Sequence, residues 1–516
     1  MDEDALHRPL YVADIVANAL TNGGDRPLLH IENGPTLTVA EVRDATSRYV
    51  QAFESLGVRR GTRVALISPN RPECLHVANA GQMIAAVNVP MHPLSGLGDH
   101  LHVIRDAGVE VLVFDAERFS ERAVAIAAEV PGLRLLALGE SPLGRDLVAL
   151  AESFDPRPLV PPRVGPHDIV RMGYSGGTTG KPKSLPSCHR TALVTLQMML
   201  AEWEWPNPPH VLTCAPLSHA GAAMFAPALL KGGTMLVLPG FEPAAVMAAI
   251  ERYRINCMLL VPTMIYALLD HPRFGEFDLS SLETVFYGAS SISPVRLKEA
   301  IERIGPVFMQ FYGQAEAPMA ISLLRKAEHD VNDVQRLASC GRPSPFLTLQ
   351  LQDAEGRAVA DCEPGEICLR GPLIMDGYRD AELTADAFRG GWLHTGDVAV
   401  RDAQGYLRIV DRTKDMIVSG GFNIYPREIE DIIAEHPAVA QVAVIGVPHD
   451  KWGEAVTALV VLKPGQTAEP EALTAPVAAR KGAFQVPKSV EFLDAIPLTP
   501  VGKPDKKALR ARYTGG

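Results

Sequence analysis

The fold of this chain is decided by Gly173-Tyr174-Ser175-Gly176-Gly177-Thr178-Thr179-Gly180-Lys181-Pro182-Lys183. Glycines let backbone N–H groups turn toward an anion, because no Cβ limits their backbone angles. The two Thr hydroxyls can donate further hydrogen bonds, and the two lysines supply positive charge. A tight surface turn is the plain alternative, but the clustering of Thr and Lys around the glycines favours a phosphate-binding loop.

Two other motifs compete for the same residues. A Walker A loop requires Gly, four residues, then Gly-Lys-Ser/Thr, but Ser175 replaces the first Gly and Pro182 replaces the hydroxyl residue. A nucleophile elbow, Gly-x-Ser-x-Gly, is matched at 173–177. An α/β-hydrolase that uses Ser175 therefore stays open as an alternative. The histidines that could complete such a triad include His219, His271 and His394.

Composition excludes several classes of protein. The chain has 516 residues, 47% hydrophobic and 21% charged, which is ordinary for a globular protein of two to four domains. Its net charge of −11 disfavours polyanionic partners, so we expect no nucleic-acid partner. The seven cysteines form no C-x-x-C pair, which favours a reducing cytoplasm. The acidic start is unlike a signal peptide, and the longest apolar stretches are too short for an integral membrane segment.

The order of predicted elements indicates an α/β fold. A capping box at Thr38 and Glu41 predicts a helix start, and short apolar strands at 64–67, 86–89, 109–114, 211–215, 234–238, 257–261 and 284–287 alternate with helices. We expect parallel-rich sheets with flanking helices. Past residue 350 the strands become short and turn-rich, which predicts a β-rich subdomain. We place an N-terminal domain at 1–411, a small α+β domain at 412–516, and a hinge near Lys414.

Further motifs follow the glycine-rich loop in a defined order. They are Pro216-Leu217-Ser218-His219, Tyr287-Gly288-Ala289-Ser290, Tyr312-Gly313-Gln314-Ala315-Glu316, Gly391-Trp392-Leu393-His394-Thr395-Gly396-Asp397, Asp411-Arg412-Thr413-Lys414-Asp415 and Pro500-Val501-Gly502-Lys503. Together with the loop they resemble the adenylate-forming (AMP-binding) superfamily, which includes acyl-CoA synthetases, peptide-synthetase adenylation domains and firefly-type luciferases. The resemblance covers about residue 10 to 512.

The resemblance implies roles for individual residues. Lys503 would hold the acid's carboxylate and the α-phosphate together, Glu316 would bind Mg²⁺ through a hard oxygen, and His219 would line the acyl site. The implied ATP site consists of Ser175, Gly177, Thr178, Thr179, Gly180, Lys183, Gly288, Ala289, Ser290, Phe311, Tyr312, Gly313, Gln314, Ala315, Asp397 and Arg412. The implied acid site consists of His219, Ala220, Gly221, Gly288, Gly313 and Met319, and the implied coenzyme A site of Ser419, Gly420, Gly421 and Phe422.

Three positions depart from the family pattern. Gly176 stands where Ser is usual, Ser184 where Gly is usual, and Ala315 where Thr usually precedes the Glu. The last change removes one hydroxyl contact to the α-phosphate. The departures leave Glu316 and Lys503 in place.

The resemblance implies an acyl-CoA ligase that uses ATP, Mg²⁺ and coenzyme A. Because the implied acid site holds no Lys or Arg, we expect an apolar fatty, alicyclic or aryl acid as substrate. Two other hypotheses remain beside the hydrolase: an adenylation enzyme that loads a carrier protein, and a nucleotide-binding protein without catalysis. A homodimer is left open.

Overall fold

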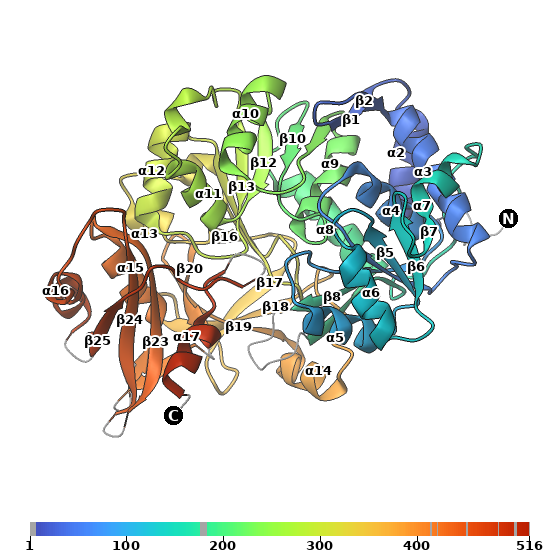
Figure 1. Ribbon diagram of the computed structural model, residues 1–516. Coiled ribbons are helices and arrows are strands. Elements are labelled where there is room, and N and C mark those ends of the chain that lie inside the picture. The colour runs from blue at the N-terminus through green and yellow to red at the C-terminus, as the bar shows by residue number, and fades with distance from the viewer. Residues whose placement is uncertain are drawn as a thin grey trace.

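The computed structural model describes residues 7–175, 183–412, 415–419, 422–449, 452–482, 485–499 and 503–514. Four sheets organise them (Figure 1). The N-terminal elements lie at the right of that view, and the C-terminal ones, from α15 to α17, lie at its lower left. No helix in the described ranges is both long and apolar enough to cross a bilayer.

A seven-stranded sheet contains the two described ends of the glycine-rich stretch, residues 173–175 and Lys183. Its strands are parallel except for the final β8–β9 pair. The order is β7 (Arg145–Asp146), β6 (Arg134–Leu138), β5 (Val111–Asp115), β3 (Arg63–Ile67), β4 (Val87–Pro90), β8 (Ile169–Ser175) and β9 (Lys183–Cys188). The helices between these strands are α4 (Pro72–Met83), α5 (Leu97–Ala107), α6 (Ser120–Glu129) and α7 (Leu147–Glu152).

A nine-stranded sheet forms the second large layer, with antiparallel strands only at its two edges. The order is β16 (Arg342–Pro343), β15 (Ser322–Leu324), β14 (Phe308–Tyr312), β13 (Thr284–Tyr287), β12 (Cys257–Leu260), β10 (His210–Thr213), β11 (Thr234–Val237), β1 (Pro27–Ile31) and β2 (Thr36–Thr38). Its helical elements are α2 (Val12–Asn22), α3 (Val39–Ser55), α8 (His189–Glu202), η1 (Ala220–Met224), α9 (Phe225–Leu230), α10 (Pro243–Tyr253), α11 (Pro262–Leu269), η2 (Phe274–Glu276), α12 (Pro294–Ile304), η3 (Lys326–Glu328) and α13 (Val334–Leu337).

Two smaller sheets complete the fold. An antiparallel sheet holds β17 (Thr348–Gln352), β18 (Pro364–Arg370), β19 (Leu393–Arg401) and β20 (Leu407–Arg412), with α14 (Ala381–Ala387) and η4 (Arg389–Gly391) beside it. The last sheet holds β22 (Phe422–Ile424), β21 (Ile417–Ser419), β24 (Gly453–Leu462), β23 (Val439–His449) and β25 (Ser489–Phe492), with helices α15 (Pro426–Ala434), α16 (Pro470–Lys481) and α17 (Lys506–Thr514).

Local sequence explains several of these elements. At the start of α3 the Glu41 N–H donates to Thr38 Oγ1 (3.2 Å) and the Thr38 N–H donates to Glu41 Oε2 (2.7 Å), so the expected capping box is present. Helix α15 begins at Pro426, which supplies a pre-set φ where no N–H is needed. The expected α/β class and the β-rich part past residue 350 are confirmed.

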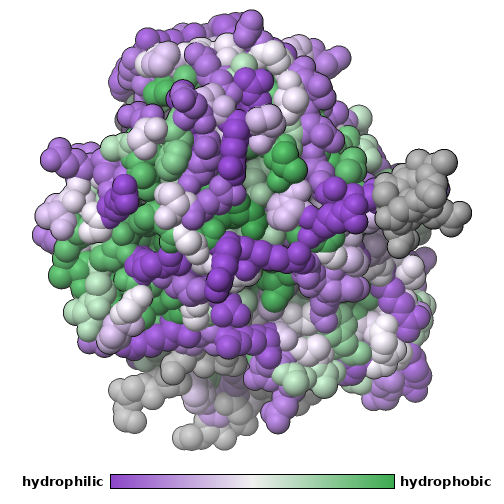
Figure 2. Space-filling model, turned by 90° about the vertical axis from the view of Figure 1, so that its right-hand side faces the viewer, coloured by the Kyte–Doolittle hydropathy of each residue, from purple (hydrophilic) through white to green (hydrophobic). Residues whose placement is uncertain are grey.

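The main hydrophobic core joins the two large sheets. One continuous cluster includes Val64 and Val111 of the first sheet, Val211 and Met235 of the second, and Phe53 of α3. Figure 2 shows polar side chains mixed among apolar ones on the face that carries the N-terminal elements. The C-terminal part contacts the second sheet region, because the Arg427 guanidinium of α15 donates to the Ile292 carbonyl (2.9 Å).

Candidate active site

A cavity of about 2150 Å³ opens at the carboxyl ends of β10, β12, β13 and β14. Ligands of open α/β sheets bind at this end of parallel strands. Expected site residues that line it are Lys183, His219, Ala220, Ala289, Ser290, Phe311, Tyr312, Gly313, Gln314, Ala315, Glu316, Met319, Asp397 and Lys503. The fold therefore gathers motifs that lie up to hundreds of residues apart.

Asp397 is tied to the loop that follows β14. The Tyr312 hydroxyl donates to Asp397 Oδ2 (2.6 Å), and Gln314 Nε2 donates to the same oxygen and to the Thr395 carbonyl (3.0 Å). Burial, with the adjacent Asp397 charge, raises the pKa of Tyr312 well above its usual value. The carboxylate is thus oriented within the cavity wall, where it could accept hydrogen bonds from sugar hydroxyls.

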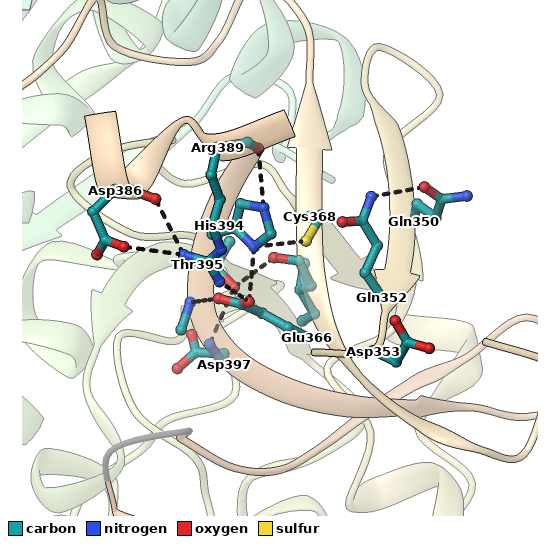
Figure 3. Close-up of polar contacts among 12 residues, drawn as sticks. Gln350, Gln352, Asp353, Glu366, Cys368, Asp386, Arg389, His394, Thr395 and Asp397 are labelled. Atoms are coloured by element: carbon teal, nitrogen blue, oxygen red, sulfur yellow. Dashed lines mark hydrogen bonds and ion pairs between the residues drawn. The ribbon is translucent and has the colours of Figure 1, made fainter. Parts of the chain in front are cut away.

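Glu366 of β18 holds the Thr395–Asp397 segment of the neighbouring strand β19 in place (Figure 3). The Gly396 N–H donates to Glu366 Oε1 (2.8 Å), while Arg389 Nη2 donates to Glu366 Oε2 (2.8 Å). His394 Nδ1 lies 2.8 Å from the same Oε2. These contacts fix the backbone that carries the cavity-lining carboxylate.

Glu366, Cys368 and His394 also have the chemistry of metal ligands, with their ligand atoms within 4.8 Å of one another. The Arg389 guanidinium already neutralises the carboxylate, however, and burial raises the pKa of the Cys368 thiol to about 12. A protonated thiol and an arginine cation both oppose metal binding. We interpret this cluster as support for the Thr395–Asp397 segment of β19.

Glu316 lines the cavity together with Tyr378 and Lys183. The Tyr378 hydroxyl donates to Glu316 Oε1 (2.6 Å), and Lys183 Nζ lies 5.8 Å from the centre of the Tyr378 ring. Mg²⁺ in phosphoryl chemistry is bound by one or two carboxylates together with substrate phosphates. A half-buried carboxylate beside a lysine fits that pattern. Tyr378 was missed from the sequence because it lies 62 positions from Glu316.

Two glycines allow the strand ends to approach closely. A Cβ on Gly288 would lie 2.3 Å from the Phe311 carbonyl oxygen, and one on Gly313 would lie 2.2 Å from the Met319 nitrogen. Neither distance is tolerable for a real side chain. Gly221 is similar, since its Cβ would lie 2.4 Å from the Ala215 carbonyl. Gly221 and Gly288 are not themselves among the cavity-lining residues, so they shape the site from behind.

Lys503 lines the cavity from the C-terminal part of the chain. Its N–H donates to Thr499 Oγ1 (3.1 Å) and its carbonyl accepts from the Thr499 N–H (2.7 Å), so its backbone is fixed. Lys506 is not a freely solvated lysine, because its Nζ lies 2.7 Å from Glu430 Oε1 and its side chain is 17% exposed. The neighbouring Lys507 is exposed.

His219 stands on the wall near a guanidinium. Burial lowers the pKa of His219 to about 3, with contributions from the Arg171 charge and from His92. The ring is therefore neutral at ordinary pH. Arg171 also lines the cavity, although it is not among the residues that the family resemblance implied for the acid site.

The path of the backbone argues against a nucleophile elbow. Ser175 ends β8 and pairs with Lys183 of β9, so the loop joins two antiparallel strands. A nucleophile elbow instead joins a strand to a helix.

Several expected residues lie outside the described ranges or are described only in part. Gly177, Thr178, Thr179, Gly180, Lys414, Gly420 and Gly421 lie outside. For Ser175, Arg412 and Phe422 the structure gives the backbone, and Arg412 pairs with Asp397 across β19 and β20. Ser419 is buried at the end of β21.

The sequence profile of the AMP-binding enzyme family matches residues 16–379, and the profile of the AMP-binding enzyme C-terminal domain matches residues 428–503. The chain belongs to the AMP-binding enzyme family. The family resemblance inferred from the motifs is thereby confirmed.

Relatives of this AMP-binding enzyme match over nearly their whole length. It is 49% identical to the medium/long-chain-fatty-acid–CoA ligase FadD8 of Mycobacterium tuberculosis, over 99% of this chain and 92% of the relative. It is 37% identical to the feruloyl-CoA synthase of an Amycolatopsis species, over 93% and 94%. Its fold matches the amide bond synthetase McbA of Marinactinospora thermotolerans with a TM-score of 0.89 at 33% identity, covering 97% and 100%.

Proposed function

We propose that this AMP-binding enzyme is an acyl-CoA ligase that activates an apolar carboxylic acid with ATP and transfers the acyl group to coenzyme A. The observation that carries the proposal is one cavity lined by Glu316, Asp397 and Lys503 together with an apolar chamber. The relatives named as fatty-acid and feruloyl CoA ligases support both the reaction and the acceptor.

The chemistry follows from the charges at the cavity wall. A carboxylate oxygen of the acid attacks the α-phosphorus of ATP, and the bond to pyrophosphate breaks. The Lys503 ammonium offsets the negative charge that accumulates in this transition state. Glu316 is the residue that would hold Mg²⁺, which when bound neutralises phosphate charge. Asp397 would accept hydrogen bonds from the ribose and fix the nucleotide.

The second half of the reaction transfers the acyl group. The thiol of coenzyme A attacks the carbonyl of the acyl-adenylate, and AMP leaves. We propose that the C-terminal domain, 412–516, turns about Lys414 between the two steps, which would bring residues 419–422 to the acyl site. Lys503 and Thr499, which are joined by two hydrogen bonds, would move together with that domain.

The apolar part of the cavity, which we call the acyl chamber, indicates the class of acid. Its lining comes from α2, α4, α8 and α9 and includes Val16, Leu75, Leu196, Met199 and Phe225. Such a lining favours burial of a hydrocarbon skeleton, at about 0.8 kcal/mol for each CH₂ group. A fatty or aryl acid therefore suits it better than a short hydrophilic one.

The test is a panel of acids assayed for pyrophosphate release and for thioester formation. We expect pyrophosphate release only when an acid is present, and acyl-CoA and AMP in equal amounts when coenzyme A is added. Adenylate formation with transfer only to a carrier protein or to an amine would replace the acceptor in this proposal. Ester hydrolysis without ATP would instead support the hydrolase. A cytoplasmic location and a homodimer remain predictions.

A further inference from the structure

Arg171 occupies an unusual place for a charged residue. It lies in the interior of β8, paired with Asn88 of β4 on one side and Ser187 of β9 on the other. Its sequence neighbours Val170 and Met172 are buried. Burial of the Arg171 guanidinium lowers its pKa, and no acidic group offsets that effect among the described residues. A guanidinium in such a setting requires a hydrogen-bond partner.

The protein supplies only part of that requirement. Arg171 Nη2 donates to the Ser218 carbonyl (2.9 Å), and within the described ranges this side chain forms no ion pair with a carboxylate. A guanidinium has five N–H donors, so most of its donor capacity is left for the cavity that it lines. Burying a charged donor without a partner is costly, which favours an acceptor brought by a ligand.

His92 adds a second donor to the same wall. Its Nδ1 accepts a hydrogen bond from the Leu94 N–H (3.1 Å), so the neutral ring carries its proton on Nε2. Its ring centre lies 4.8 Å from that of His219, which in turn lies beside Arg171. Burial lowers the pKa of His92 as well, which keeps the ring neutral. Arg171 and His92 thus both offer hydrogen-bond donors on the cavity wall that they share.

The position of Arg171 separates it from the phosphates. It precedes Ser175 by four residues in an extended strand, and a strand advances about 3.3 Å per residue, so the two Cα atoms are roughly 13 Å apart. Its contact at Ser218 instead places it next to His219 and Leu217, at the acyl chamber. Its ligand is therefore a group of the acid rather than the triphosphate.

We propose that Arg171, assisted by His92, binds a second oxygen acceptor on the carbon skeleton of the acid substrate. The acceptor is an oxo, hydroxyl or second carboxylate oxygen, carried by an otherwise apolar acid. Water can satisfy these donors in the free enzyme, but an all-carbon tail that displaces the water cannot replace its hydrogen bonds. The site therefore selects an acid that carries an oxygen at the position that Arg171 and His92 reach. This inference rests on the proposed ligase function, since it assigns a specificity residue within that activity.

The experiment compares kcat/KM for decanoic acid, oxodecanoic acids with the oxo group moved along the chain, and decanedioic acid. We expect the wild-type enzyme to prefer at least one oxygen-bearing acid over decanoic acid by tenfold or more. Arg171→Met should reduce that preference at least tenfold, while Arg171→Lys should retain part of it. The exposed Arg163→Met is the matched control and should change nothing. Preference for the diacid identifies an anionic acceptor, and preference for an oxo acid a neutral one.

Two results would overturn the inference. One is a wild-type enzyme that prefers decanoic acid to every oxygen-bearing acid. The other is a folded Arg171→Met enzyme in which all acids lose the same factor, as a purely structural contact with Ser218 would produce. If Arg171→Met does not fold, His92→Phe provides the second measurement, with a reduced preference expected and an unchanged one contradicting the inference. Failure of the ligase function is distinct, since no acid would then release pyrophosphate.

Discussion

Lys503→Ala gives the sharpest test of the adenylation step. The wild-type lysine lines the cavity together with Glu316, and its backbone is fixed on both sides by Thr499. A preorganised charge needs no reorganisation when the transition state forms, so removing it slows adenylation by the whole of its stabilising effect. Removing one such contact costs about 10²–10³ in rate, or roughly 2.7–4 kcal/mol. We expect at least this loss in acid-dependent pyrophosphate release.

Two half-reaction assays separate this role from a general defect. Conversion of a supplied acyl-adenylate to acyl-CoA should proceed at near wild-type rate in Lys503→Ala, because the charge acts before the adenylate exists. The matched control is Lys463→Ala, at a lysine of the same C-terminal part that is not among the cavity-lining residues, and it should leave both rates unchanged. Lys506 cannot serve as the control because it is paired with Glu430.

The reasoning fails if Lys503→Ala and Lys463→Ala behave alike in pyrophosphate release. It fails equally if Lys503→Ala slows both half-reactions by the same factor while the protein stays folded. In either case another cation must act at the α-phosphate.

Further predictions concern four other residues. Lys414→Pro, which fixes φ and removes an N–H at the expected hinge, should slow thioester formation far more than adenylate formation, and equal losses in both would count against domain alternation. The wild-type protein should form no covalent adduct with a fluorophosphonate probe; an adduct that is lost in Ser175→Ala would restore the hydrolase hypothesis. Tyr378→Phe removes the donor to Glu316 and should raise the KM for Mg·ATP by about tenfold, which steady-state kinetics would detect; an unchanged KM would separate Tyr378 from the nucleotide site. Burial lowers the pKa of His76 to about 4, below its unfolded value near 6.5, so its contribution to stability is present above about pH 6.5 and is lost as the pH falls toward 4. The free energy of unfolding, measured with denaturant, should therefore fall by about 2 kcal/mol less in His76→Phe than in the wild type between about pH 7 and pH 5. The same dependence of this free energy on pH in both proteins would refute the assignment.

Much of the fold was predictable from local signals. The capping box at Thr38 and Glu41 and the apolar strand at 63–67 are each set by residues that are neighbours in the chain. Strand ends shifted by one or two residues, as at β4, because hydrogen-bonded pairing with β3 and β8 determines where a strand stops. The order of strands in the two large sheets could not be read from the sequence, since it depends on crossovers between distant segments.

The candidate site was predictable where the motifs themselves carry the chemistry. Glu316, Asp397 and Lys503 line one cavity, as the family resemblance implied. Tyr378 could not be found, because only the packing of the 378 region against β14's following loop brings its hydroxyl to Glu316. Arg171 did leave a signal: an arginine between Val170 and Met172 in an apolar strand is rarely accidental.

The hydrogen bond between Tyr312 and Asp397 joins residues 85 positions apart and links the nine-stranded sheet to the antiparallel sheet. If the nucleotide binds at this contact, as proposed, its pocket does not exist in either half of a partly folded chain, and a contact between such distant residues is slow to form. The nucleotide would then bind the native state and not its folding precursors, so by mass action it would stabilise the native state against unfolding. At a concentration one hundred times its dissociation constant it would add about 2.7 kcal/mol to stability. In a cell, the supply of ATP would then govern how long this enzyme survives as well as how fast it works.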